Sequence, residues 1–159
     1  MEISSAFDAG NIEVVDCSDP AAVKLNIRRD NEADFFQWFY FRVCGVRGVD
    51  CRFQILNAAE ASYPKGWEGY RACASYDRED WFRVPSSYDG TALRIAHRAE
   101  HDSVYFAYFA PYSRERHRDL VARCQATGRA RLEVLGRTVD GDDLDLLVVG
   151  EDDPAKRRC

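Results

Sequence analysis

His97, Glu100 and His101 spell the pattern H-x-x-E-H, a spacing associated with zinc chemistry. In zinc peptidases with this pattern a helix places both histidines on one face as ligands, and the glutamate acts as general base on the metal-bound water. Here the pattern follows the strand-like residues 93–95 and precedes another strand, and no third protein ligand is apparent. We therefore expect a solvated loop between strands. An independent metallohydrolase built on these three residues is kept as a third alternative.

Four aspartates near the carboxyl end suggest a calcium site: Asp140, Asp142, Asp143 and Asp145. A calcium-binding EF-hand loop places its glycine in the middle of the loop and closes with a glutamate. In this segment the glycine directly follows Asp140, and no glutamate closes a twelve-residue loop. The Asp-Gly pair instead predicts a hairpin turn that carries acidic side chains on its surface.

Ser86, Ser87 and Asp89 are residue types found in serine hydrolases, and a histidine follows them at position 97. Neither serine lies in the G-x-S-x-G elbow that exposes a nucleophile at a strand-to-helix turn. The segment from Pro85 is typical of an ordinary turn. We therefore assign no catalytic residue and no metal ligand to this chain, and its substrate-binding residues are not identified.

Six cysteines stand at positions 17, 44, 51, 73, 124 and 159, without a C-x-x-C pair. Disulfide scaffolds are usually shorter and denser in cysteine, and zinc sites usually show paired spacing. Free, mostly buried thiols in a reducing compartment are the expectation. The first five residues contain neither a basic stretch nor an apolar segment of a secretory signal. Both observations favour a cytoplasmic protein.

The composition indicates a globular domain with a sheet-rich core. Aromatic residues make up 13% of the chain, and the net charge is −5 with both signs interspersed. This charge argues against nucleic acid as the main partner, and the absence of 18 consecutive apolar residues argues against a membrane span. The aromatic run Trp38–Phe41 invites comparison with a base-stacking platform, but Arg42 alone does not make a basic groove. A core strand is the preferred interpretation.

The first 110 residues alternate between apolar and polar positions in short runs. Val23, Leu25 and Ile27 form one such run. In residues 35–43 aromatic side chains stand at both odd and even positions, which predicts a central strand covered on both faces. Further strands are expected at 51–55, 70–76, 81–84, 93–95 and 104–109. Seven or eight strands at this spacing predict an antiparallel β-sandwich.

The pattern changes after Pro111. Ser113 is placed to cap a helix that ends near Ala126, and Gly128 is a plausible stop. Residues 132–135 and 144–149 then predict two strands, the second apolar at nearly every position, as in a sheet covered on both faces. A helix and two strands cannot cover such a sheet. The sequence therefore predicts that the natural protein continues beyond this segment.

Several motifs resemble those of the cytosolic carboxypeptidase family, in particular its bacterial-type members. The most distinctive is QWFYFRV at 37–43, and FDAGNI at 7–12 is similar to the family's opening strand, which usually has serine where Ala9 stands. The other matching segments follow in the family's order: FQILNA at 53–58, GWEGY at 66–70, SYDREDWFRVP at 75–85, YFAYFAPYS at 105–113, and GRTVDG with DLDLL over 136–147.

The resemblance implies an amino-terminal β-sandwich accessory domain at residues 1–111 and the truncated start of an α/β zinc carboxypeptidase domain at 112–159. In the family a zinc ion is held by two histidines and a glutamate, and another glutamate acts as general base. All of these residues belong to motifs that follow the first catalytic hairpin, so none is carried over here. Zinc is expected only in the missing catalytic domain.

The sequence thus predicts an inactive, non-catalytic segment of a metallocarboxypeptidase that removes carboxy-terminal residues from peptides or proteins. Its expected partners are its own catalytic domain and the substrate of the parent enzyme, and association into a homo-oligomer is left open. The alternative is a free-standing β-sandwich module that binds a protein or carbohydrate partner. The accessory interpretation predicts an exposed apolar face on the last hairpin, which such a module does not require.

Overall fold

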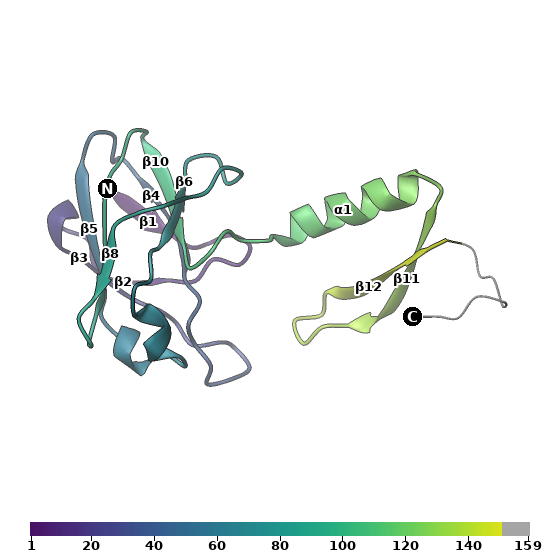
Figure 1. The fold of residues 1–159 in the computed structure, drawn as a ribbon, viewed down its shortest axis with the longest axis horizontal. Helices are drawn as coiled ribbons and strands as arrows, with labels where there is room; N and C mark the ends of the chain where they lie inside the picture. The colour runs from purple at the N-terminus through teal and green to yellow at the C-terminus, as the bar shows by residue number, and fades with distance from the viewer. Residues whose placement is uncertain (151–159) are drawn as a thin grey trace. The chain divides into compact units, whose positions relative to one another are not determined.

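The structure, a computed structural model, describes residues 1–150. The chain divides into two compact units, Met1–Pro111 and Tyr112–Cys159, and each is described here by itself (Figure 1). The first unit contains two five-stranded sheets. The second contains one helix and one hairpin within its described residues, 112–150.

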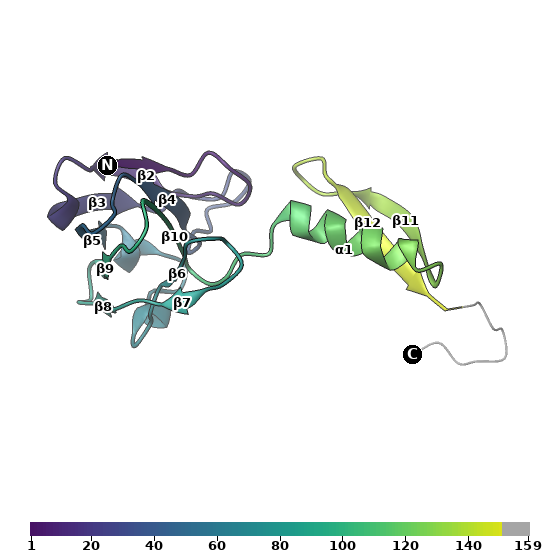
Figure 2. The same cartoon turned by 90° about the horizontal axis from the view of Figure 1, so that it is seen from above.

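The first sheet has the strand order β1-β4-β10-β6-β7, and all of its neighbouring strands are antiparallel. Its strands are β1 (Glu2–Ser4), β4 (Tyr40–Cys44), β10 (Ser103–Ala107), β6 (Cys73–Ser75) and β7 (Phe82–Arg83). The second sheet has the order β2-β3-β5-β9-β8. Its strands are β2 (Glu13–Asp16), β3 (Val23–Asn26), β5 (Asp50–Ile55), β9 (Leu93–Arg98) and β8 (Ser86–Tyr88). Figure 2 shows β3, β5, β9 and β8 in a row apart from β4, β10, β6 and β7. The predicted mainly β sandwich is confirmed.

The expectation of purely antiparallel pairing is wrong at one place, because β3 and β5 run parallel. The chain leaves β3 in the second sheet, forms β4 in the first sheet, and then returns as β5. This crossing between the sheets brings β5 back in the same direction as β3. Three short 3₁₀ turns complete the unit: η1 (Pro20–Ala22), η2 (Ala58–Glu60) and η3 (Pro64–Trp67).

The core lies between the two sheets and is centred on aromatic rings from both. Phe41 and Phe106 are neighbours in the first sheet, and Phe53 faces them from β5 with ring centroids 5.6 and 4.9 Å away. All three side chains are fully buried. Burying each ring contributes about 1.5–3 kcal/mol, so this layer is a major source of the unit's stability.

The strand predicted at residues 35–43 is shorter than expected. Regular pairing begins only at Tyr40, because the backbone N–H and C=O of Phe36 bond to the hydroxyl and N–H of Ser62 at 2.9 Å each. Phe36 and Phe39 are nevertheless buried, whereas the side chain of Phe35 is 61% exposed. The central position of the strand is confirmed, since β4 lies between β1 and β10.

The second unit has the predicted helix and hairpin. Helix α1 (Arg114–Ala126) begins after Ser113, whose hydroxyl accepts a hydrogen bond from the Arg116 N–H at 3.2 Å. Strands β11 (Ala130–Arg137) and β12 (Asp143–Val149) pair antiparallel. The turn contains Gly141, whose φ of +85° favours glycine.

The hairpin is apolar on both faces. Leu132 and Asp145 lie on the face that packs against α1, and on the opposite face Leu135 and Leu144 are exposed. A strand pair with apolar residues on both faces is typical of the interior of a larger sheet. Within residues 1–150 no helix is long and apolar enough to cross a membrane.

Candidate interaction surface on the first sheet

A second cluster of aromatic side chains covers the outer face of the first sheet. Because Phe41 and Val43 point into the core, the alternation of β4 directs Tyr40 and Arg42 to the other face. Tyr40 is only 1% exposed, since its ring is surrounded by other rings. We call this group the aromatic surface; its members are Phe7, Trp38, Tyr40, Trp81, Tyr105 and Phe109.

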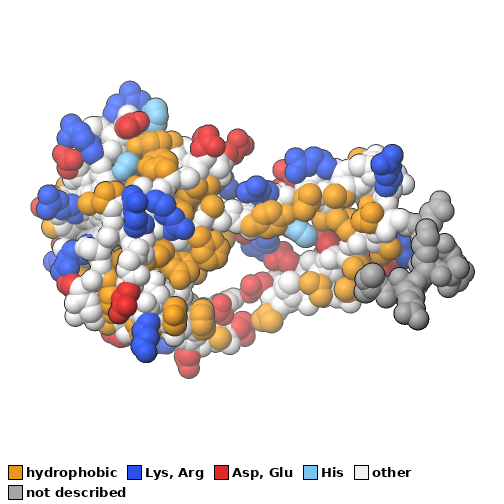
Figure 3. Space-filling view, in the orientation of Figure 1, with side chains coloured by type: hydrophobic (Ala, Val, Ile, Leu, Met, Phe, Trp, Pro, Cys, Tyr) orange, Lys and Arg blue, Asp and Glu red, His pale blue; other side chains and the backbone are white. Residues whose placement is uncertain are grey.

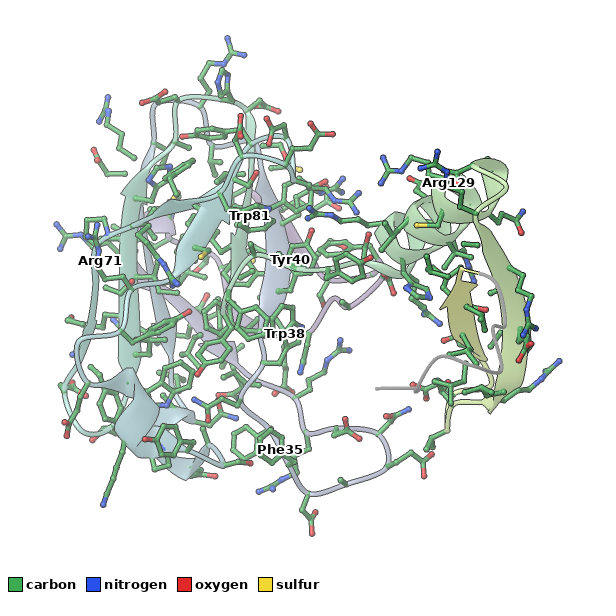
Figure 4. All side chains as sticks on the ribbon, turned by 45° about the vertical axis from the view of Figure 1, so that its right-hand side comes forward. Phe35, Trp38, Tyr40, Arg71, Trp81 and Arg129 are labelled. Carbon is green, nitrogen blue, oxygen red and sulfur yellow. The ribbon has the colours of Figure 1, made fainter. Side chains whose placement is uncertain are left out.

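The rings of the aromatic surface are in direct edge contact. The Tyr40 ring centroid lies 4.8 Å from that of Phe7 and 5.9 Å from that of Trp81. Trp38 contacts Phe109, whose centroid is 4.9 Å away. Figure 4 shows Trp81, Tyr40 and Trp38 following one another along one side of the unit. Figure 3 shows patches of hydrophobic side chains on the face of the first unit that is turned to the viewer, with basic and acidic side chains beside them.

Both tryptophans are fixed by hydrogen bonds from their indole N–H groups. Trp38 Nε1 donates to the carbonyl oxygen of Ala9 at 2.7 Å, and Trp81 Nε1 donates to that of Arg78 at 3.1 Å. Ala9 and Arg78 have φ of +60° and +71°, and within the described chain they are the only non-glycine residues with positive φ. Each such conformation costs roughly 1–2 kcal/mol for an L-residue. The strained residues are thus those whose carbonyls hold the two indoles.

The turn that contains Arg78 is organised by Asp77 and Ser75. One carboxylate oxygen of Asp77 accepts hydrogen bonds from the N–H groups of Glu79 and Asp80 at 2.8 and 2.9 Å. These bonds hold the pKa of Asp77 below its ordinary value. The buried hydroxyl of Ser75 accepts from the Arg78 N–H at 2.8 Å. The turn is therefore specified by side chains rather than by a glycine.

Two arginines lie on this surface beside tyrosines. The Arg78 guanidinium lies 5.9 Å from the ring centroid of Tyr105, and Arg42 hydrogen-bonds to the same tyrosine. Burial raises the pKa of Tyr40, and the nearby Arg78 opposes this shift. The pKa of Arg42 is raised by its neighbours Cys44 and Tyr105 and, to a smaller extent, by the carboxylate of Glu2. The surface therefore combines aromatic rings with two arginines.

The H-x-x-E-H residues do not form a metal site in the structure. His97 lies inside β9, paired with Cys51, so the expectation of a loop is wrong at this residue. Its Nε2 is 2.9 Å from the hydroxyl of Tyr76, which also accepts a hydrogen bond from the backbone N–H of Glu100 at 2.9 Å. His101 contacts the Tyr76 ring edge-on at 4.6 Å. Burial lowers the pKa of His97, consistent with a neutral structural histidine.

The described residues contain no group of three or more His, Cys, Asp or Glu side chains arranged to hold a metal ion. Of the four aspartates considered for calcium, Asp142 pairs with Arg114, and Asp145 lies 3.0 Å from His117 Nε2. These contacts connect α1 to the hairpin. Asp140 and Asp143 lie in the turn and at the start of β12.

The other candidate nucleophiles have structural roles. Ser86 Oγ accepts a hydrogen bond from the Ala72 N–H at 3.0 Å and donates to the Val84 carbonyl. The five cysteines of the described chain are free, as expected, but only Cys51 and Cys73 are buried. The expectation of mostly buried thiols is wrong, because Cys17, Cys44 and Cys124 are partly exposed. Burial raises the pKa of the Cys51 thiol, which makes it less reactive. Cys159 lies outside the described residues.

Comparison with known proteins gives the class of the chain. The family model for the cytosolic carboxypeptidase N-terminal domain matches residues 3–109. A metallo-carboxypeptidase structure from Burkholderia cenocepacia is 49% identical with a TM-score of 0.92, over 96% of this chain and 40% of that one. A putative carboxypeptidase structure from Burkholderia mallei is 50% identical with a TM-score of 0.93, over 98% of this chain and 40% of that one. A Zymomonas mobilis protein is 43% identical, over 95% of this chain and 40% of its own length.

The chain therefore belongs to the cytosolic carboxypeptidase N-terminal domain family, as its motifs suggested. It spans about 40% of the length of the relatives it matches. The family description agrees with the cytoplasmic localisation expected from the cysteines. The resemblance drawn from the sequence is confirmed, and so is the fold class.

Proposed function

We propose that this chain is the non-catalytic amino-terminal domain, with the first catalytic elements, of a zinc-dependent metallocarboxypeptidase. The parent enzyme removes carboxy-terminal residues from peptides or proteins. The observation that carries the proposal is the likeness to metallo-carboxypeptidase structures at 49–50% identity over nearly the whole chain, which covers only 40% of those proteins. The portion without a counterpart here is large enough to hold a catalytic domain.

Residues 1–111 form the accessory domain in this proposal, and residues 112–159 begin the catalytic domain. The family model ends at residue 109, and the hairpin that follows has apolar residues on both faces. A hairpin of this kind is suited to the interior of a larger sheet covered by helices. The peptide substrate and the catalytic domain are the partners that this role requires.

The zinc is assigned to the catalytic portion that follows this chain. The histidine and carboxylate side chains described here do not fit such a site, because His97 is engaged by Tyr76 and Glu100 contributes only its backbone N–H there. When bound, the zinc would polarise the scissile carbonyl and lower the pKa of its bound water. This chain contributes no ligand to it.

The test is to express the full-length parent and the 159-residue chain side by side. The parent is expected to release the terminal residue of a synthetic peptide, to contain zinc, and to lose activity on chelation. The shorter chain is expected to be inactive. A parent gene that ends at Cys159, or a full-length protein without zinc-dependent peptidase activity, would contradict the proposal and make a free-standing binding module the leading explanation.

A further inference from the structure

We propose that the outer face of the second sheet carries a binding site for a small phosphorylated molecule. The site, which we call the Ala96 hollow, is lined by Ala96, Pro85 and three arginines, Arg52, Arg94 and Arg98. It lies within the first unit and on the other sheet from the aromatic surface. The inference goes beyond the proposed function, which does not require such a site.

The pairing of β5 with β9 places the three arginines around Ala96. Arg52 is directly opposite Ala96 in the register, and Arg94 and Arg98 stand two residues before and after it on the same strand. Ile95 is buried in the core, so the alternation of β9 directs Ala96 and its arginine neighbours to the outer face. All four of these outer residues are exposed. One small side chain is thus surrounded by three long, positively charged ones.

The short side chain of Ala96 leaves a depression in this face. Two adjoining hollows of about 380 and 460 Å³ are both lined by Arg52, Pro85 and Ala96. Arg98 lines the first of them and Arg94 the second. The carbonyl of Pro85 accepts a hydrogen bond from the Ala96 N–H at 3.0 Å, which fixes the proline beside the strand. Hollows of this size are typical of small-molecule sites, and side chains carried on paired strands are well positioned before a ligand binds.

Positive charge exceeds negative charge at the Ala96 hollow. Arg98 pairs with Asp50 at 2.6 Å, and Arg94 pairs with Asp89. In the described part of the chain Arg52 forms no ion pair. A guanidinium has five N–H donors, so the two paired arginines also retain donors for a ligand. The hollow is therefore suited to an anion.

The arrangement of the donors indicates which anion fits. A carboxylate is planar and is satisfied by one guanidinium fork, whereas a phosphate presents three strong acceptor oxygens in different directions. Arginines on two neighbouring strands, placed around one small residue, suit the second geometry. Ala96 and Pro85 add apolar surface beside these donors, which suits an organic group attached to the phosphate. A phosphate monoester of a small molecule meets both conditions.

The test is a titration of this chain with phenyl phosphate at constant ionic strength, followed by amide NMR. The Ala96 N–H signal reports on the hollow, and a dissociation constant of about 1 mM is expected from two charge-assisted contacts. Inorganic phosphate should bind severalfold more weakly because it lacks the apolar ring, and benzoate should bind more weakly because it lacks the phosphate. No shift of the Ala96 signal at about twentyfold this concentration would overturn the inference. Benzoate that binds as tightly as phenyl phosphate would also overturn it.

Two substitutions that remove one positive charge each separate a site from general attraction to a basic surface. Arg52→Gln removes the arginine without an ion pair and is expected to weaken binding about tenfold. Arg47→Gln is the matched control, because Arg47 is an exposed arginine that does not line the hollow, and this variant should bind like the wild type. Equal weakening by the two substitutions would show that the anion binds adventitiously, and the inference would fail.

Ala96→Leu fills the hollow without changing the charge. Binding, read from the Arg52 N–H signal, is expected to weaken by about tenfold or more, whereas binding at the wild-type level would place the ligand elsewhere and reject the site. A urea unfolding curve checks that the variant is folded, and Arg52→Gln still decides the question if it is not. None of these measurements uses peptidase activity. An active parent enzyme whose amino-terminal portion does not bind phenyl phosphate would therefore refute this inference and leave the proposed function intact.

Discussion

The positive φ at Ala9 leads to a prediction of opposite effects for one substitution at two nearby positions. Replacing Ala9 by glycine removes the Cβ that makes φ +60° unfavourable, and it retains the carbonyl that accepts from Trp38. Ala6 lies three residues earlier in the same loop, is also exposed, and does not have positive φ. Ala6→Gly is therefore the matched control.

The expected magnitudes follow from two opposing terms. The left-handed conformation costs an L-residue roughly 1–2 kcal/mol, which Ala9→Gly removes. Glycine also gives the unfolded chain more conformational entropy, which lowers the free energy of unfolding by about 0.4–1 kcal/mol at either position. Ala9→Gly should therefore stabilise the first unit by about 0.5–1 kcal/mol. Ala6→Gly should destabilise it by a similar amount, because no strain is relieved there.

The assay is equilibrium unfolding in urea, followed by tryptophan fluorescence, with the midpoint and m-value compared among the wild type and the two variants. Shifts of opposite sign at constant m would support the reasoning. If both variants lose stability to the same extent, Ala9 is not strained, and the argument that strain holds the Trp38 indole in place fails.

Three other predictions concern different parts of the chain. Burial lowers the pKa of His97 below its ordinary value of 6.5, so the unfolded chain takes up this proton at a higher pH than the folded chain does. Stability should therefore be complete above about pH 6.5 and fall as the pH decreases below it. His97→Gln should flatten this part of a plot of Tm against pH. Asn57 bonds both the N–H and the C=O of Ile27, at 3.0 and 2.8 Å, and Asn57→Ala should cost about 1–3 kcal/mol in urea unfolding by leaving these groups unpaired. Ser113→Ala should cost α1 about 1 kcal/mol, seen as earlier loss of helical circular dichroism on heating, whereas Ser113→Asp should retain the cap; equal losses would contradict the capping role.

The strands could be predicted from the sequence where burial alternates along it. In β5 the buried residues Cys51, Phe53 and Ile55 alternate with more exposed neighbours. The alternation of apolar and polar residues in the sequence therefore corresponds directly to the buried and exposed faces of the strand. The cap at Ser113 and the stop at Gly128 were also predictable, because these residue types satisfy the unpaired groups of a helix end.

The parts that could not be predicted depend on contacts distant in the sequence. The parallel pairing of β3 with β5 results from the path of the chain through the other sheet, which no local pattern encodes. Strand β4 begins only at Tyr40, later than predicted, because the backbone of Phe36 bonds to Ser62 instead of to a neighbouring strand. His97 was expected in a loop because its neighbours are polar, but pairing with β5 keeps it in a strand.

The aromatic surface was hidden in the sequence for a physical reason. Trp38, Tyr40 and Arg42 share one parity in β4 and the residues before it, yet an aromatic run looks the same whether a residue faces the core or a second layer. The indole partners are backbone carbonyls, which every residue has. A positive φ can often be predicted at a glycine, because glycine adopts this conformation readily. Alanine and arginine do not favour it, so the positive φ of Ala9 and Arg78 could not be predicted from their residue types.

The hairpin with two apolar faces also has a consequence for the order in which the protein is made. In a parent of the length of the Burkholderia relatives, roughly 220 residues would remain to be translated after Cys159, which would take about 10–45 s at ordinary elongation rates. During that time the sandwich already has all of its strands. During the same time Leu135 and Leu144 stay exposed to solvent, beside the outer edges of the β11–β12 pair. Until it is covered, a hairpin with exposed leucines and open strand edges is prone to pair with other chains.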